Sequence, residues 1–127
     1  MNLEKVIFAF FIVLAATLNF GFFIGDIERP ELHNIYELFA AIVINMIATV
    51  LKFGDRTQIG AVHLSTSLVA DLQLIAAAVT WATAVHISGT GMTPAVTASV
   101  VSLSGGALLA NIISLTILVV ETVMMRR

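Results

Sequence analysis

Apolar residues fill four long blocks of this chain, and short segments rich in charged residues, glycine or proline separate them. The blocks span residues 5–25, 35–53, 61–87 and 94–125. A helix rises 1.5 Å per residue, so about 20 apolar residues cross a hydrocarbon layer of about 30 Å. Every block reaches this length, and the last two exceed it, which predicts tilted or protruding helices. The pattern predicts a single all-α domain, residues 1–127, that forms an integral membrane bundle of four transmembrane helices.

The blocks lack the pattern of membrane-spanning strands, in which apolar and polar residues alternate over about ten positions. Residues 6–14, for example, are apolar at every position. We also expect the first block to be a retained helix rather than a cleaved signal peptide. Glu4 offsets Lys5 in the leader, and the apolar run continues well beyond Ala16.

The basic residues lie almost entirely on one side of this four-helix topology. Five of the six are on the side of the termini, and Arg29 alone is in the opposite loop. The five are Lys5, Lys52, Arg56, Arg126 and Arg127. Because basic residues are retained on the cytoplasmic side, the asymmetry predicts that both termini face the cytoplasm, as in a protein of the bacterial inner membrane. It also argues against insertion in both orientations.

Composition excludes several other classes of protein. The 127 residues are 59% hydrophobic and 11% charged, and the mean hydropathy is +1.04, whereas soluble domains carry about 25% charged residues. The lack of a basic patch argues against nucleic-acid binding. With no cysteine, disulfides, thiolate metal sites and cysteine nucleophiles are excluded. We therefore expect a lipid bilayer around the chain, and neither a cofactor nor a bound metal within it.

Small residues predict where the helices pack closely. A ridge with a spacing of four residues runs along the last block and consists of Ala98, Ser102, Gly106, Ala110 and Ser114. Gly21 and Gly25 form a GxxxG pair at the end of the first block. In lipid, close backbone approach through small residues drives helix association. The contacts belong either to packing within one chain or to a homo-oligomer interface. Because one small bundle has little interior, we expect any aqueous path to lie between subunits or against a partner.

Asp71 is the most informative single residue. It lies near the middle of the apolar stretch 64–85, and no Lys or Arg occurs at the same depth. A charge at the centre of a bilayer helix costs about 2.5–3.5 kcal/mol on insertion scales. Asp71 must therefore be protonated, bind a cation or face water inside a bundle. Each of these states indicates ion handling.

Four other polar residues could form a pathway with Asp71. Asn45 and Asn111 lie near the midplane of their blocks, where their amides either contribute to an ion path or hydrogen-bond between helices. His63 and Ser67 precede Asp71 at steps of four residues, so all three share one helix face. A hydrolase triad needs the histidine between the serine and the acid, whereas here the serine lies between them. We therefore expect a proton or ion path and no enzyme.

A second candidate site lies on the outer side. Acidic residues and one histidine gather around the loop between the first two blocks, namely Asp26, Glu28, Glu31, His33 and Glu37. Such a group either binds or concentrates cations at an outer mouth or forms a solvated acidic loop.

These patterns favour a small inner-membrane ion channel or transporter subunit. We expect it to conduct an inorganic cation or protons and to act as a homo-oligomer, with Asp71 at the membrane midplane. The alternative is a non-catalytic accessory or assembly protein whose small-residue faces pack against a larger membrane protein.

Overall fold

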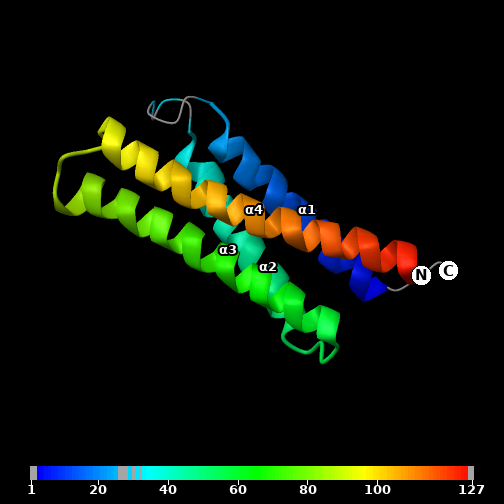
Figure 1. Ribbon diagram of the computed structural model, residues 1–127. Helices are drawn as coiled ribbons and strands as arrows, with labels where there is room; N and C mark the ends of the chain where they lie inside the picture. Colours follow the sequence, from blue (N-terminus) through cyan, green and yellow to red (C-terminus); the bar gives the residue numbers. More distant parts are fainter. Residues whose placement is uncertain (1–2, 26–28, 30, 32, 126–127) are drawn as a thin grey trace.

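The computed structural model describes residues 3–25, 29, 31 and 33–125 and contains four long helices (Figure 1). They are α1 (Leu3–Phe23), α2 (Ile35–Lys52), α3 (Gln58–Ala82) and α4 (Pro94–Met125), and a π-helical turn, η2 (Thr83–Ile87), continues α3. All four are long and apolar enough to cross a membrane. The prediction of an all-helical chain with four such helices is confirmed, and these helices are typical of an integral membrane protein. No strand occurs in the ranges described.

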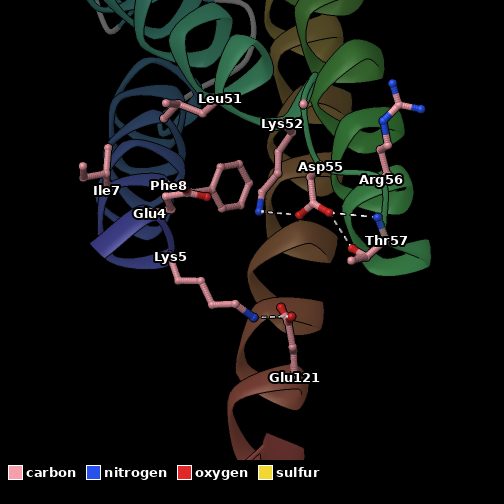
Figure 2. Close-up of a pocket in the computed structure, with 11 residues that line it drawn as sticks. Glu4, Lys5, Ile7, Phe8, Leu51, Lys52, Asp55, Arg56, Thr57 and Glu121 are labelled. Carbon is pink, nitrogen blue, oxygen red and sulfur yellow. Dashed lines mark hydrogen bonds and ion pairs between the residues drawn. The ribbon is translucent and has the colours of Figure 1, made fainter. Parts of the chain in front are cut away.

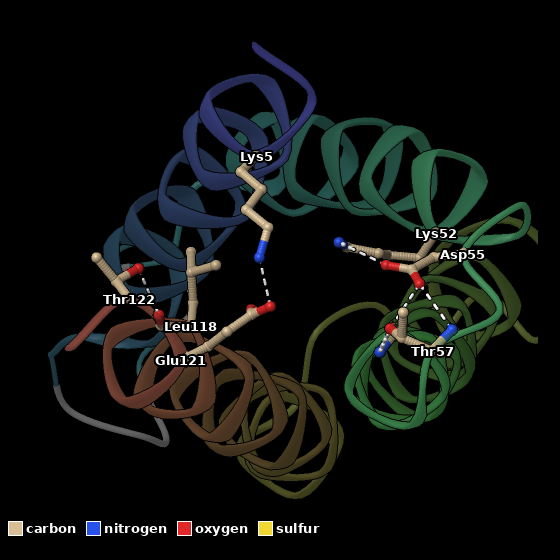
Figure 3. A network of polar contacts seen from close by, with 8 residues as sticks. Lys5, Lys52, Asp55, Thr57, Leu118, Glu121 and Thr122 are labelled. Carbon is tan, nitrogen blue, oxygen red and sulfur yellow. Dashed lines mark hydrogen bonds and ion pairs between the residues drawn. The ribbon is translucent and has the colours of Figure 1, made fainter. Parts of the chain in front are cut away.

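The helices run antiparallel in a closed ring. α1 packs against α2 and α4, and α3 packs against α2 and α4, with the most extensive contact between α3 and α4. Figure 3 shows this ring from one end. The start of α1, the end of α4 and the turn between α2 and α3 lie together at that end (Figure 1). We name it the basic end because it carries Lys5, Lys52 and Arg56.

Local sequence signals fix where the helices begin. The Asn34 side chain caps α2 by accepting a hydrogen bond from the Tyr36 N–H, and the Thr57 hydroxyl caps α3 by accepting one from the Gly60 N–H. α4 begins at Pro94, whose fixed φ suits a first helical turn. Gly89 and Gly91 have φ values of 71° and 73° in the connection before α4. Glycine is suited to these positions because it lacks a Cβ.

The interior contains two apolar clusters with polar side chains between them. The larger cluster lies in the half of the bundle away from the basic end and includes Phe22, Leu38, Leu74 and Val100. The smaller cluster lies near the basic end and consists of Phe8, Ile12 and Ala48. Many large apolar side chains instead point outward, as expected for a lipid-facing surface. They include Phe10, Val43, Leu72, Leu109 and Val119.

The small-residue ridge of α4 does not stay on one face of the helix. Ala110 and Ser114 are buried, Ala98 and Gly106 are half-buried, and Ser102 is exposed. A four-residue step exceeds the 3.6-residue period by about 40°, so five positions rotate through about 160°. The ridge as a whole therefore contributes only part of its length to packing within the chain. In the GxxxG pair, Gly21 near the end of α1 is half-buried, and Gly25 lies beyond the helix and is exposed.

Gly106 lies at a close α3–α4 contact, and we expect Gly106→Leu to destabilise the bundle. A Cβ at this position would lie 2.6 Å from the Gln73 Nε2 atom. Alanine requires only a shift of that flexible amide, whereas leucine adds atoms that must separate the two helices. Overpacking of this kind costs about 1–3 kcal/mol, so the thermal unfolding temperature in detergent should fall. Gly54→Leu is the matched control, because nothing lies within 4 Å of a Cβ there. Equal unfolding temperatures for both variants would contradict the contact.

Candidate functional site

Asp71 is buried inside the single chain and is held by α2. Its Oδ1 accepts a hydrogen bond from the Asn45 Nδ2 at 2.9 Å, and its Oδ2 accepts one from the Thr49 hydroxyl at 2.5 Å. The Asp71 residue is only 8% exposed. Both donors are neutral, and no salt bridge to Asp71 occurs in the part of the chain described. The carboxylate therefore has hydrogen-bond partners without a fixed countercharge.

The next part of the site lies between α3 and α4. His63 is fully buried, and its Nδ1 lies 2.7 Å from the Ser114 hydroxyl oxygen. Because α3 and α4 are antiparallel, one turn from this contact brings Ser67 of α3 to the level of Asn111 of α4. Both side chains are fully buried. His63, Ser67 and Asp71 thus follow one buried face of α3 from the basic end to the middle of the bundle.

Seven buried side chains therefore form a continuous polar region, which we name the polar band. It consists of Asn45, Thr49, His63, Ser67, Asp71, Asn111 and Ser114. Several of its atoms have no hydrogen-bond partner, namely Asn45 Oδ1, His63 Nε2, Ser67 Oγ and both polar atoms of the Asn111 amide. A buried unpaired polar group costs about 1–3 kcal/mol. The band therefore contains buried donors and acceptors that are not used in hydrogen bonds within the described chain.

At the basic end, a cavity of about 700 Å³ opens between the start of α1, the end of α2, the α2–α3 turn and α4 (Figure 2). We name it the vestibule. The Lys5 ammonium pairs with the Glu121 carboxylate, and the Lys52 Nζ lies 3.5 Å from Asp55 Oδ2. The vestibule therefore contains charged groups of both signs that α1, α2, α4 and the α2–α3 turn bring together.

Asp55 is ordered by the turn that precedes α3. The Thr57 hydroxyl donates to Asp55 Oδ1 at 2.6 Å, and the Thr57 N–H donates to the same oxygen at 2.9 Å. These bonds lower the pKa of Asp55, and Lys52 lowers it further. The lowered pKa stabilises the folded state at pH values above the ordinary pKa of an aspartate. This contribution is lost as the pH falls through the folded-state pKa. At neutral pH, Asp55 is ionised and positions Lys52.

Phe8 separates the vestibule from the polar band. On the vestibule side, the Lys52 Nζ lies 4.2 Å from the centroid of the Phe8 ring. On the other side, the centroids of the Phe8 and His63 rings are 5.0 Å apart. Phe8 is 1% exposed. An ammonium over an aromatic face is attracted by the ring quadrupole, which favours this closed arrangement.

Beyond Asp71, away from the vestibule, the interior is mainly apolar. The larger cluster fills it with side chains such as Phe22, Leu38 and Leu74. The amide of Asn19 is buried there and lies 2.9 Å from the Ser104 carbonyl oxygen and 3.0 Å from the Leu108 nitrogen. The polar band therefore extends from Asp71 toward the basic end, and closely packed side chains close its other end.

The outer candidate residues do not converge as the band does. Asp26 and Glu28 lie outside the described residues. Glu31 pairs with Arg29 at 2.8 Å, and the Glu37 side chain packs against Gly21 of α1. His33 is buried and lies before α2, which begins at Ile35, whereas Glu37 is inside α2. The two side chains therefore do not share a helix face, although they are four residues apart. Its Nδ1 lies 2.5 Å from the Phe22 carbonyl oxygen.

No group of three metal-ligating His, Asp or Glu residues occurs where the chain is described.

Sequence reasoning missed three contributors to the site. Thr49 is one turn from Asn45 on the same face of α2 and also bonds to Asp71. Polar residues four positions apart share a face in any helix, so this spacing alone did not single out Thr49. Phe8 lies among other apolar residues, so the sequence does not distinguish it from them. Lys52 lies at a helix end, where basic residues commonly anchor a helix at the membrane interface. Ser114 was expected only as a packing residue, yet it contacts His63.

Comparison with known proteins shows that the chain belongs to a family of unknown function (DUF6394), whose model matches residues 32–122. The match includes α2, α3 and most of α4, and therefore every residue of the polar band. Phe8 and the rest of α1 precede it. No curated protein and no solved structure matches the chain.

The position of Phe8 predicts that it controls access to the polar band from the vestibule. Because the chain has no cysteine, Ser67→Cys introduces a single thiol into the band. We expect slow modification of this thiol by a charged, membrane-impermeant thiol reagent when Phe8 is present. Phe8→Ala or the milder Phe8→Leu should accelerate the reaction, because each shortens the side chain between the cavity and His63. Mass spectrometry of the detergent-solubilised protein measures the rate.

Leu74→Cys is the matched control, because Leu74 is also fully buried but lies in the apolar cluster beyond Asp71. Its reactivity should stay low in both Phe8 backgrounds. Equal acceleration of the two thiols would indicate general loosening of the bundle. An unchanged rate at Ser67→Cys in both Phe8 variants would show that Phe8 is not the barrier.

Proposed function

We propose that the protein is a small ion transporter subunit of the bacterial inner membrane in which Asp71 binds and releases a proton or a monovalent cation. The observation that carries this proposal is the set of contacts of Asp71. A buried carboxylate accepts hydrogen bonds from Asn45 and Thr49 and has no cationic partner among the ion pairs described. Intramembrane acids of this kind mark ion or proton pathways.

Neutral donors leave the charge of Asp71 available to a mobile ion. A permanent Lys or Arg partner would neutralise the carboxylate and compete with any arriving cation. Asn45 and Thr49 instead stabilise the carboxylate without cancelling its charge. A hydroxyl and an amide can also accept hydrogen bonds. The same residues can therefore adjust when Asp71 gains or loses a proton.

Barriers on both sides of Asp71 favour a transporter over a permanently open channel. The polar band extends from Asp71 toward the vestibule, and Phe8 closes that side. On the other side, Phe22, Leu38 and Leu74 pack closely. A site near the midplane with barriers on both sides is typical of alternating access, in which one barrier opens at a time.

The convergence of the polar residues changes where the path is expected. Asn45, Asp71 and Asn111 are buried in one bundle, so the pathway does not require a second copy of the chain. We retain homo-oligomerisation as part of the proposal because small residues such as Ser102 and Gly25 remain exposed for close helix contact. The alternative, an accessory protein beside a larger membrane partner, predicts no ion movement by the purified chain.

The basic end is proposed to face the cytoplasm, so the vestibule opens there. Lys5, Lys52 and Arg56 support this orientation through the retention of basic residues on that side. A reporter fused after Arg127 should be active only as a cytoplasmic reporter, and one inserted in the segment 26–31 only as an external reporter. The opposite pattern would contradict the orientation.

Asp71→Asn tests the function. The amide keeps the size of the side chain and its hydrogen-bonding capacity, but it removes the exchangeable charge. We expect the variant to fold and assemble, while its cation or proton flux in liposomes falls by at least roughly tenfold, since the intramembrane acid carries the ion.

Thr116→Val is the control for a polar residue lost from an exposed position, because the Thr116 hydroxyl bonds only within its own helix. Its flux should match that of the native chain at equal protein density. Native flux and ion preference in Asp71→Asn would show that Asp71 is structural.

A further inference from the structure

We infer that the centre of the polar band is a binding site for a dehydrated Na⁺ ion, with Asp71 as its charged ligand and with protons as competitors. The inference rests on the proposed role of Asp71 as an ion site and names the ion. Asn45, Thr49, Ser67 and Asn111 supply the neutral oxygen ligands. The site is formed by α2, α3 and α4.

The charge of the site selects a monovalent ion. Asp71 is the one carboxylate in the polar band, and one Na⁺ neutralises it. A divalent cation would leave a net positive charge in a low-dielectric interior, which is strongly unfavourable. Four other titratable groups of the described interior lie toward the basic end: His63 on α3, Lys52 on α2, and Lys5 and Glu121 on α1 and α4. At the opposite end, His33 is buried and Glu37 is half-buried, and they lie against Phe22 and Gly21.

The free atoms of the band are of the type that binds Na⁺. Asn45 Oδ1, Ser67 Oγ and Asn111 Oδ1 are buried and have no hydrogen-bond partner. Carboxylate, amide and hydroxyl oxygens suit hard cations, whereas transition metals prefer imidazole or sulfur ligands. The three residues are fully buried and lie on three different helices. They can therefore surround an ion beside Asp71.

Helix register brings these ligands within one helical turn of one another along the bundle. Asn45 is in direct contact with Asp71 at 2.9 Å. Ser67 is one turn from Asp71 on the same face of α3, and Asn111 lies across from Ser67 in the register defined by the His63–Ser114 contact. α1 contributes the buried apolar residues Ile12 and Ala15 to the interior, and Ile12 belongs to the same apolar cluster as Ala48 of α2, next to Thr49. Water is thereby limited, and the ion must shed its hydration shell.

The contacts of Asp71 can be exchanged for ion coordination without movement of the backbone. A half-turn of the Asn45 amide about its terminal bond replaces the donated N–H with Oδ1. The Thr49 O–H can likewise turn from Asp71 to the Asn45 carbonyl oxygen, which lies 3.0 Å from Oγ1, and leave a lone pair of the hydroxyl for the ion. Hydrogen bonds hold the ionised carboxylate when no cation is present, and oxygen ligands replace them when Na⁺ enters.

The number of ligands and their burial favour Na⁺ over K⁺. Five residues supply oxygen ligands, and each is at most 8% exposed in a closely packed interior. A larger ion needs a wider cage with more oxygens, as in the carbonyl rings of potassium channels. We therefore expect K⁺ to bind poorly.

Two measurements on the purified full chain in detergent test the site. The first is thermal unfolding in NaCl or KCl at equal ionic strength. An ion that binds only the folded chain raises the unfolding temperature, so NaCl should stabilise the native protein more than KCl. The second is labelling by a hydrophobic carbodiimide, which reacts with protonated carboxyl groups. Na⁺ should slow the labelling of Asp71, as read by mass spectrometry, and K⁺ should not.

Variants assign the effect to this site. Asp71→Asn should abolish both the Na⁺-specific stabilisation and the Na⁺-protected label. Ser67→Ala and Asn111→Leu should weaken Na⁺ protection while Asp71 remains reactive. Thr116→Val, on the exposed face of α4, should retain the full response.

The outcomes separate this inference from the proposed function. Labelling of Asp71 that depends on pH but not on Na⁺ would overturn the Na⁺ site and leave a proton site intact. If Asp71 resists labelling, thermal unfolding decides, and equal stabilisation by NaCl and KCl overturns the inference. An Na⁺ effect that persists in Asp71→Asn also overturns it. Native flux by Asp71→Asn would instead remove the proposed function.

Discussion

The hydrogen bonds from α2 to the buried carboxylate of Asp71 are the contact on which the rest of the account depends. Asn45 and Thr49 satisfy both oxygens across the α2–α3 interface. They allow a charge-bearing residue to occupy the interior of an apolar bundle, where an unsatisfied carboxylate would be costly. Because neither donor is charged, the pair provides local stability without neutralising the charge of Asp71.

The remaining architecture isolates this contact. The larger apolar cluster fills one half of the bundle, and Phe8 lies between the polar band and the vestibule at the other end. Buried polar groups are worth most, and cost most when unpaired, where water is excluded. The bundle thus combines a stable apolar framework with a central region of unpaired oxygens. This division allows a chain of 127 residues to contain the proposed ion site within a single copy.

Length and hydropathy predicted the four helices because each apolar block exceeds what a water-soluble helix would tolerate. The burial of Asn45, Asp71 and Asn111 agrees with their positions near the middle of the apolar blocks. Helix rotation was not predictable, so the sequence did not indicate that Asn45 contacts Asp71 while Asn111 remains unpaired. Rotation also explains Ser102, since small residues four apart drift around the helix. Phe8 gave no signal because its role depends on Lys52 and His63, which are distant in sequence.

The central claim is that Asp71 changes its protonation or ion-binding state while the bundle stays folded. Infrared difference spectroscopy of the protein in lipid measures this directly through the carboxyl C=O stretch. We predict a carboxylic acid band that appears on acidification, disappears reversibly at higher pH and is missing from Asp71→Asn. A band in native protein that does not respond to pH or added cations, or one that persists in Asp71→Asn, would contradict this claim.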